Sequence, residues 1–173
     1  MAIREIVQHT DPFIRKKSRD VKFIDDNIIE LLDDMKETVL AANGSGLAAV
    51  QVGVLKRIFV ININGAYLEF INPEIIEESE EDVTFSEGCL SLPGISENVI
   101  RPASITIRYM DENFTEHTET YDGFAARIIQ HEYDHLEGHV FTDRISPIRR
   151  QFVKTKLTNI AKGKVAARYR TKR

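Results

Sequence analysis

The chain has 173 residues, of which 42% are hydrophobic and 29% are charged, and its formal net charge is −4. This length and composition predict a single domain with a substantial core over residues 1–173 and exclude an intrinsically disordered protein. No apolar run is long enough to span a bilayer, and residues 1–10 lack the apolar core of a signal peptide, so we expect a cytoplasmic protein without membrane partners. The single cysteine, Cys89, cannot form an internal disulfide, and its thiol is free to pack, react or bind a metal.

Charge is distributed unevenly along the chain. Eleven of the 23 Lys and Arg residues follow Asp143, whereas none of the 27 Asp and Glu residues does. The sequence therefore predicts a basic, mobile tail over residues 162–173 on an acidic body. Two interpretations stay open: the tail contacts nucleic acid or an acidic surface, or it is a solvated helix end that balances the charge of the body.

Helical periodicity begins at Asp26 and predicts an amphipathic helix that ends near Asn43. Asp25 or Asp26 is suited to cap the first turn, and Gly44 stands where a left-handed C-cap is needed. The apolar residues that recur at helical spacing are Ile28, Ile29, Leu32, Met35, Val39 and Leu40.

Two pairs of strands are predicted further along the chain. The first pair alternates, is rich in β-branched residues and flanks a strong type I′ turn signal, and the second pair flanks a polar turn. The predicted strands are residues 57–64, 66–71, 104–110 and 117–121, with turns at Asn64-Gly65 and at residues 111–113.

Two more helices complete the predicted fold. One begins at Asp122-Gly123 and ends near Gly138, and the other begins at Pro147 and ends at Gly163. We therefore expect a single α+β domain in which antiparallel strands pack around a central helix, with one helix N-terminal and one C-terminal to it. The predicted packing stripe of the last helix is Ile148, Phe152, Val153, Leu157 and Ile160.

The central helix carries the motif HExxH as Gln130-His131-Glu132-Tyr133-Asp134-His135. Two histidines one turn apart project from the same helix face and are placed to grip a single metal ion, and the glutamate faces the open side of that metal. This pattern indicates metal-assisted hydrolysis. The motif alone also fits a helix whose histidines face solvent or satisfy core hydrogen bonds.

A catalytic metal site usually has three protein ligands and one open position. Asp134 and Glu137 are poor candidates for the third ligand, because they lie in or just beyond the same helical turn as His135. Cys89 is the better candidate, since it lies in a glycine-flanked turn where the backbone can bring a thiolate close to a helix. The alternative is that Cys89 fills the core.

The glycine-rich stretch at residues 44–53 contains one polar side chain, Gln51, in an otherwise apolar run. Small residues let the backbone approach a ligand or a neighbouring element closely, and a buried amide needs partners. The commoner use of such a stretch is to cap a helix and lead into a strand, with Gln51 bonded to a neighbouring backbone group.

Three motifs occur in order along the chain and together resemble the signature motifs of the peptide deformylase family. Their spacing matches that family, and the elements between them have compatible lengths. Three ordered motifs are far more specific than one HExxH. They are Gly44-x-Gly46-Leu47-Ala48-Ala49-x-Gln51, Glu87-Gly88-Cys89-Leu90-Ser91 and Gln130-His131-Glu132-x-x-His135.

The resemblance implies hydrolysis of the N-formyl group from the initiator methionine of nascent polypeptides, with release of formate. By match of motif, Cys89, His131 and His135 are the metal ligands. The family characteristically uses Fe(II), and Ni(II), Co(II) or Zn(II) are expected in preparations. A cysteine and two histidines accept any of these ions.

The resemblance also implies catalytic roles for Glu132, Gln51 and Leu90. Glu132 takes a proton from the water that attacks the formyl carbon and delivers it to the leaving amine. The side-chain amide of Gln51 and the backbone N–H of Leu90 join the metal in stabilising the oxyanion.

Substrate binding requires an apolar pocket for the methionine side chain and strand-like pairing for the peptide backbone. By family position, the chain near Ser45, Gly46 and Gly88 pairs with the substrate. The residues expected in the pocket are Phe85, Phe124, Ile128 and His131.

Two positions depart from the common family pattern. Ser45 stands where many members have an aliphatic residue, and Arg127 stands where an apolar residue is frequent. We expect Arg127 either to point outward or to reshape the pocket rim. Arg101 matches a family arginine, and its expected ion pair with Glu87 would support the cysteine turn.

Resemblance to bacterial members further suggests that the basic C-terminal helix and tail dock near the ribosomal exit, without sequence-specific recognition of nucleic acid. Two other classes of protein match the pattern less well. An HExxH endopeptidase takes a downstream ligand, but Glu137 and Asp143 follow His135 too closely. A non-catalytic, metal-stabilised module needs four ligands, and the sequence offers no convincing fourth.

Overall fold

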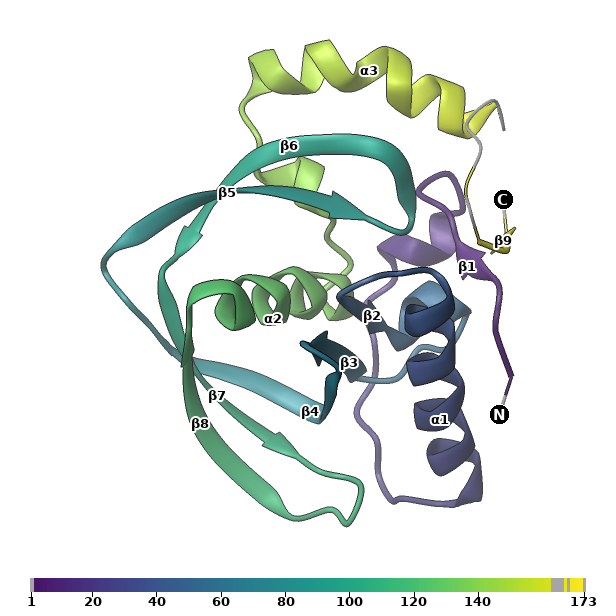
Figure 1. Cartoon of the computed structure of the whole chain (residues 1–173), viewed down its shortest axis with the longest axis vertical. Coiled ribbons are helices and arrows are strands. Elements are labelled where there is room, and N and C mark those ends of the chain that lie inside the picture. Colours follow the sequence, from purple (N-terminus) through teal and green to yellow (C-terminus); the bar gives the residue numbers. More distant parts are fainter. Residues whose placement is uncertain (1, 163–166, 168, 173) are drawn as a thin grey trace.

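The structure, a computed structural model, describes residues 2–162, 167 and 169–172. Its main feature is a five-stranded antiparallel sheet with the strand order β2-β3-β4-β7-β8 (Figure 1). Four of these strands match the two predicted pairs, and β4 is longer than expected. The strands are β2 (Gly46–Ala48), β3 (Ile58–Ile63), β4 (Ala66–Glu78), β7 (Ser104–Met110) and β8 (Glu116–Asp122).

A second antiparallel pair, β5 (Asp82–Cys89) and β6 (Leu92–Pro102), was not predicted from the sequence. Few side chains of β5 are buried, so this strand lacks the regular alternation that marks a strand with one face in the core. Cys89 is its last residue, beside a shift of register at Gly88, rather than part of a free turn.

The helix α2 (Gly123–Leu136) lies between the main sheet and the β5–β6 pair, as predicted for the helix that carries the HExxH motif (Figure 1). Its apolar side packs into the sheet through Ala126, Ile128, Ile129 and Leu136. Its other side is buried as well, although it is polar. Buried polar groups need partners, so this side of α2 is where specific chemistry is to be sought. The buried polar residues are Arg127, Gln130, Glu132, Asp134 and His135.

The helix α1 (Asp26–Ala41) confirms the predicted N-terminal helix, and the side chain of Asp25 caps it by accepting a hydrogen bond from the backbone of Ile28. The predicted left-handed cap at Gly44 is wrong. Asn43 takes the positive φ of 55° instead, which is a conformation that asparagine tolerates better than most residues. Gly44 leaves room for the Leu90 side chain, because a Cβ there would lie 2.9 Å from Leu90 Cδ1 and that side chain would have to shift.

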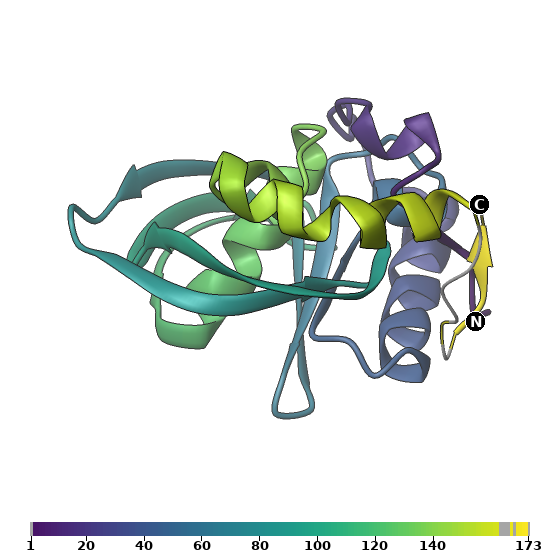
Figure 2. The same ribbon diagram turned by 90° about the horizontal axis from the view of Figure 1, so that it is seen from above.

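The predicted turn at Asn64-Gly65 is confirmed, since both residues have the positive φ that a type I′ turn requires. The last helix, α3 (Pro147–Ala161), lies against β6 on the outer side of the hairpin (Figure 2). Its predicted packing stripe is only partly right. Val153 is buried, but Ile148 is 70% exposed and Phe152 is 67% exposed. The predicted stop at Gly163 and the side chain of Ile160 lie outside the described residues.

The two ends of the chain meet. Strand β1 (Ile6–Val7) pairs in parallel with β9 (Thr171–Lys172), and both ends lie on the same side of the molecule (Figure 1). Within the predicted mobile tail, the described residues 169–172 therefore lie against the body, and residues 163–166, 168 and 173 are outside the description. In the part of the chain that the structure describes, no helix is both long enough and apolar enough to cross a membrane.

Candidate metal centre

The structure brings together the three side chains that the sequence singled out as metal ligands. His131 and His135 project from consecutive turns of α2, and Cys89 reaches them from the end of β5. One ligand atom from each lies within 4.8 Å of the others, and Cys89 Sγ is 3.3 Å from His135 Nε2. A thiol and two imidazoles at this spacing form a donor set suited to a divalent transition metal.

The protonation pattern of the histidines fits a metal. Glu87 Oε1 lies 2.9 Å from His131 Nδ1, which places the proton on that nitrogen and leaves Nε2 to face the centre. Burial and the positive charge of His131 lower the pKa of His135 to about 3, so its imidazole is neutral. Burial by itself lowers the pKa of His131, but hydrogen bonds to Cys89 and Glu87 raise it well above its usual value. Hydrogen bonds to the Cys89 sulfur and the Glu87 carboxylate thus favour positive charge at His131.

Glu132, the glutamate of the motif, lies beside these donors and is only 3% exposed. Its Oε2 is buried and has no hydrogen-bond partner among the described residues. Burial raises the pKa of Glu132 to about 7, against the attraction of His131. Its other oxygen, Oε1, lies 3.7 Å from His131 Nε2. A carboxyl group with a pKa near neutrality and one oxygen without a hydrogen bond is suited to pick up and release a proton.

Glu87 forms hydrogen bonds with several of the groups that surround the metal centre. The predicted ion pair with Arg101 is confirmed, with Arg101 Nε 2.7 Å from Oε2 and Arg101 Nη2 2.9 Å from Oε1. Burial alone would raise the pKa of Glu87, but its hydrogen bonds with His131 and Arg101 hold it far below the usual range. The carboxylate therefore stays ionised and orients His131.

Arg127 points inward, and its side chain is 4% exposed. It donates to Glu87 Oε2 at 2.6 Å and to the carbonyl oxygens of Val83 and Val99, and it lies over the ring of Phe85. Of the two expected positions, the outward one is therefore wrong. Arg127 ties α2 to both strands of the β5–β6 pair beside the site.

Gln51 reaches the centre from a 3-10 helix (Ala49–Val52) that follows β2. Its oxygen accepts a hydrogen bond from the backbone N–H of Ala48 at 2.9 Å, and its Nε2 lies 3.1 Å from Ser91 Oγ and 3.6 Å from Cys89 Sγ. The amide is thus held with its donor nitrogen toward the cysteine, which is the orientation that an oxyanion would need.

A cavity of about 710 Å³ opens in front of these groups. Its walls include most of the residues that the sequence placed in substrate binding: Ser45, Gly46, Gly88, Phe124 and Ile128. Phe85 is not among the lining residues and instead packs on Arg127. Ala167 and Tyr169 also line the cavity, and no pattern in the sequence indicated them.

At Gly46 the backbone lies close to the helix that carries Glu132. A Cβ there would lie 3.0 Å from Glu132 Cγ and 3.0 Å from Ile128 Cγ2. We expect Gly46→Ala to displace the Glu132 side chain, lowering kcat at least tenfold and stability by about 1–2 kcal/mol. Steady-state kinetics and urea unfolding measure both effects, with Ser45→Ala as the neighbouring control. Wild-type turnover by Gly46→Ala would contradict the tight fit.

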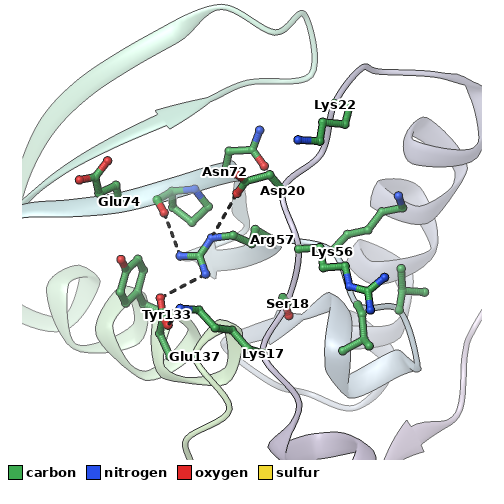
Figure 3. A pocket seen from close by; sticks show the side chains of 14 residues that line it. Lys17, Ser18, Asp20, Lys22, Lys56, Arg57, Asn72, Glu74, Tyr133 and Glu137 are labelled. Carbon is green, nitrogen blue, oxygen red and sulfur yellow. Dashed lines mark hydrogen bonds and ion pairs between the residues drawn. The ribbon is translucent and has the colours of Figure 1, made fainter.

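A second cavity, of about 970 Å³, lies at the C-terminal end of α2, away from the cysteine (Figure 3). Arg57 is at its centre, with its guanidinium 3.1 Å from Glu137 Oε1 and 3.2 Å from the carbonyl oxygen of Pro73. Glu137 also pairs with Lys17, and Asp134 pairs with Arg101 and Arg144. The two acids that the sequence excluded as third ligand are therefore occupied in ion pairs that hold α2 in place.

Among the described residues, the centre has three protein donors rather than the four of a closed structural site, and beside them lies a carboxylate whose Oε2 has no hydrogen-bond partner. These features place the protein among the metal-dependent hydrolases. Residues 3–151 match the family model described as polypeptide deformylase. A peptide deformylase of Christiangramia forsetii is 44% identical over 185 residues, covering 97% of this chain and 94% of the relative, and that of Cytophaga hutchinsonii is 44% identical over 178 residues, covering 98% and 97%.

Solved structures agree with these relatives. A Plasmodium falciparum peptide deformylase superimposes with a TM-score of 0.88 at 36% identity, covering 92% of this chain and 96% of that one. The Legionella pneumophila enzyme gives a TM-score of 0.87 at 36% identity, covering 93% and 96%. The chain belongs to the peptide deformylase family. It is a metal-dependent hydrolase that removes the N-formyl group from the initiator methionine of nascent polypeptides and releases formate.

Proposed function

We propose that Cys89, His131 and His135 hold the catalytic metal ion of this deformylase and that residues 1–173 act as one catalytic domain. The observation that supports the ligand set is the convergence of one sulfur and two nitrogen atoms within 4.8 Å. Fe(II) is the proposed ion in the cell, with Ni(II), Co(II) or Zn(II) in preparations, because the donor set accepts all four. When bound, the metal supplies a Lewis acid that favours ionisation of water and polarises the formyl carbonyl.

Glu132 is the proposed general base and acid. Its partner-free Oε2 accepts the proton of the attacking water, and the carboxyl group then donates that proton to the departing amine. An amide nitrogen leaves poorly unless it is protonated, so both transfers are needed. A pKa near 7 suits a group that must do both at neutral pH.

Gln51 and the backbone N–H of Leu90 are the proposed protein donors to the oxyanion. Gln51 Nε2 already lies close to Cys89 Sγ, and Leu90 follows Cys89 in the chain. Donors that are held in place before the reaction lower the barrier without reorganisation.

Replacing Gln51 by leucine is therefore expected to lower kcat about 100-fold, since the loss of one oxyanion donor costs about 3 kcal/mol of transition-state stabilisation. The change in KM should be small, because the oxyanion forms only during reaction. Steady-state kinetics on formyl-Met-Ala-Ser measure both constants, and Gln51→Glu is the isosteric companion. A leucine variant within threefold of wild-type kcat would remove Gln51 from the mechanism.

The proposed substrate site is the cavity of about 710 Å³. Phe124 and Ile128 supply apolar wall for the methionine side chain, and Phe85 supports it through Arg127. Strand β2 lies at the edge of the main sheet, so the chain at Ser45 and Gly46 is placed to pair with an extended peptide, opposite Gly88.

We further propose that the enzyme works in the cytoplasm and docks at the ribosomal exit through the basic C-terminal region. Lys154, Lys156 and Lys162 are exposed there. Reversing these three charges should weaken co-sedimentation with ribosomes while leaving turnover of a short formyl-peptide unchanged. Unchanged co-sedimentation would refute the docking surface.

The test of the proposed site is formate release from formyl-Met-Ala-Ser by anaerobically purified, Fe(II)-loaded protein. Release should stop when the metal is removed by a chelator and return on adding Fe(II), and Cys89→Ala should bind the ion weakly. The matched peptide without the formyl group tests the endopeptidase alternative, because cleavage of that peptide would favour it. Metal binding without formate release would leave the non-catalytic module as the better interpretation.

A further inference from the structure

We propose that Ala167 and Tyr169, near the C-terminus, are part of the active site and that Tyr169 is a positioning residue for the oxyanion donor. The inference rests on the proposed role of the Leu90 N–H. The tyrosine hydroxyl donates to the carbonyl oxygen of Leu90 at 2.5 Å, and Tyr169 and Ala167 line the substrate cavity. The family model matches residues 3–151, so Tyr169 lies outside the matched part of the chain.

The turn at Leu90 and Ser91 is fixed by hydrogen bonds and by side-chain packing. Gln8 Nε2 lies 3.3 Å from the same carbonyl oxygen, and the backbone N–H of His9 donates to Ser91 O at 2.8 Å. The Leu90 side chain packs against Gly44, where a Cβ would come within 2.9 Å of it. Residues from both ends of the chain therefore meet at the one residue that follows Cys89.

The pairing of β1 with β9 explains how Tyr169 is delivered to this place. Ile6 N donates to Arg170 O, and Gln8 N donates to Lys172 O, each at 2.9 Å. Tyr169 precedes this pairing directly, and its ring packs against the hydrophobic cluster formed with α1. Pairing with the N-terminal strand β1 thus positions the tyrosine at the wall of the cavity.

The Leu90 carbonyl belongs to the peptide plane that follows Leu90, and the donor N–H of Leu90 belongs to the plane that precedes it. Holding the carbonyl fixes the first plane and so limits rotation about the two backbone bonds of Leu90 that join it to the donor. An oxyanion donor is effective only when it already points to the position that the oxyanion will occupy. A hydroxyl that stays protonated is required for this, and burial raises the pKa of Tyr169 to about 12. Loss of the hydroxyl should therefore act mainly on the transition state rather than on substrate binding.

Tyr169→Phe removes only the hydroxyl and is the decisive variant. We expect kcat on formyl-Met-Ala-Ser to fall about fivefold to tenfold, with KM within twofold of wild type and an unchanged melting temperature. Tyr67→Phe is the matched control, because Tyr67 packs against the same hydrophobic cluster but does not line the cavity. A Tyr169→Phe enzyme that matches Tyr67→Phe in kcat would overturn the proposal.

Deletion of residues 167–173 extends the test. We expect it to lower kcat more than Tyr169→Phe does, and a deletion variant with wild-type kcat would also overturn the proposal. If the deletion impairs folding, Tyr169→Phe decides alone. Glu132→Ala, measured in parallel, distinguishes failure of this inference from failure of the proposed site. Formate release that depends on Glu132 but not on Tyr169 would contradict only the positioning role. No formate release from the wild-type protein would contradict the proposed site itself.

Discussion

Replacing Glu132 by glutamine is expected to lower kcat by about 10³-fold or more, because general acid–base catalysis by a positioned group contributes up to about 10⁴-fold. The substitution keeps the shape of the side chain but removes its ability to accept a proton. Formate release under saturating substrate measures the loss. Metal content should be unchanged, since Glu132 is not among the three clustered donors.

The same substitution is expected to stabilise the metal-free protein. Burial raises the pKa of Glu132 to about 7, so the folded state resists ionisation of this group while the unfolded chain ionises it near pH 4.5. Wild-type stability is therefore lost as pH rises from about 4.5 to 7, and the glutamine variant should gain about 3 kcal/mol over wild type at pH 8 and nothing at pH 4. Denaturant unfolding of both metal-free proteins at the two pH values measures the gap. An active variant, or one less stable than wild type at pH 8, would contradict the assignment.

The chemistry of the centre also explains which parts of the structure could be predicted from the sequence. The residues at the centre are recognisable because the chemistry fixes their types and their spacing: His131 and His135 must lie one turn apart, and Glu132 must lie beside them. The helix that carries them was predicted for the same reason. Local capping and turn rules predicted α1 and the Asn64-Gly65 turn.

The parts that the sequence did not predict depend on partners distant in the chain. Few residues of β5 are buried, and the buried residues of β6 do not alternate regularly. The sequence of this pair therefore lacks the two-residue hydrophobic periodicity by which a strand is predicted. The inward position of Arg127 depends on carbonyl oxygens at Val83 and Val99, which are fixed only once those strands exist. Tyr169 contacts Leu90, which is 79 residues earlier in the chain, and it lies next to a two-residue strand that carries no local signal.

Among the variants described, Glu87→Gln is expected to lower the free energy of unfolding the most. Glu87 accepts hydrogen bonds from Arg101 and Arg127, both buried, and it orients His131. Removing one partner of a buried charge cluster leaves the others uncompensated and costs about 3–5 kcal/mol. The loss of a group that orients a metal ligand should also weaken metal affinity about 10- to 100-fold.

Glu97→Gln is the matched control, because Glu97 lies directly opposite Glu87 in the β5–β6 register and pairs with Arg149 at the surface. Arg149 is 51% exposed, and an ion pair that solvent reaches contributes at most about 1 kcal/mol, so this variant should unfold close to wild type. Urea unfolding of the metal-free proteins gives the stability difference, and competition with a chromogenic chelator gives metal affinity. If the two variants lost equal stability and kept equal metal affinity, Glu87 would be an ordinary strand residue, and the orientation of His131 would have to come from the packing of α2 alone.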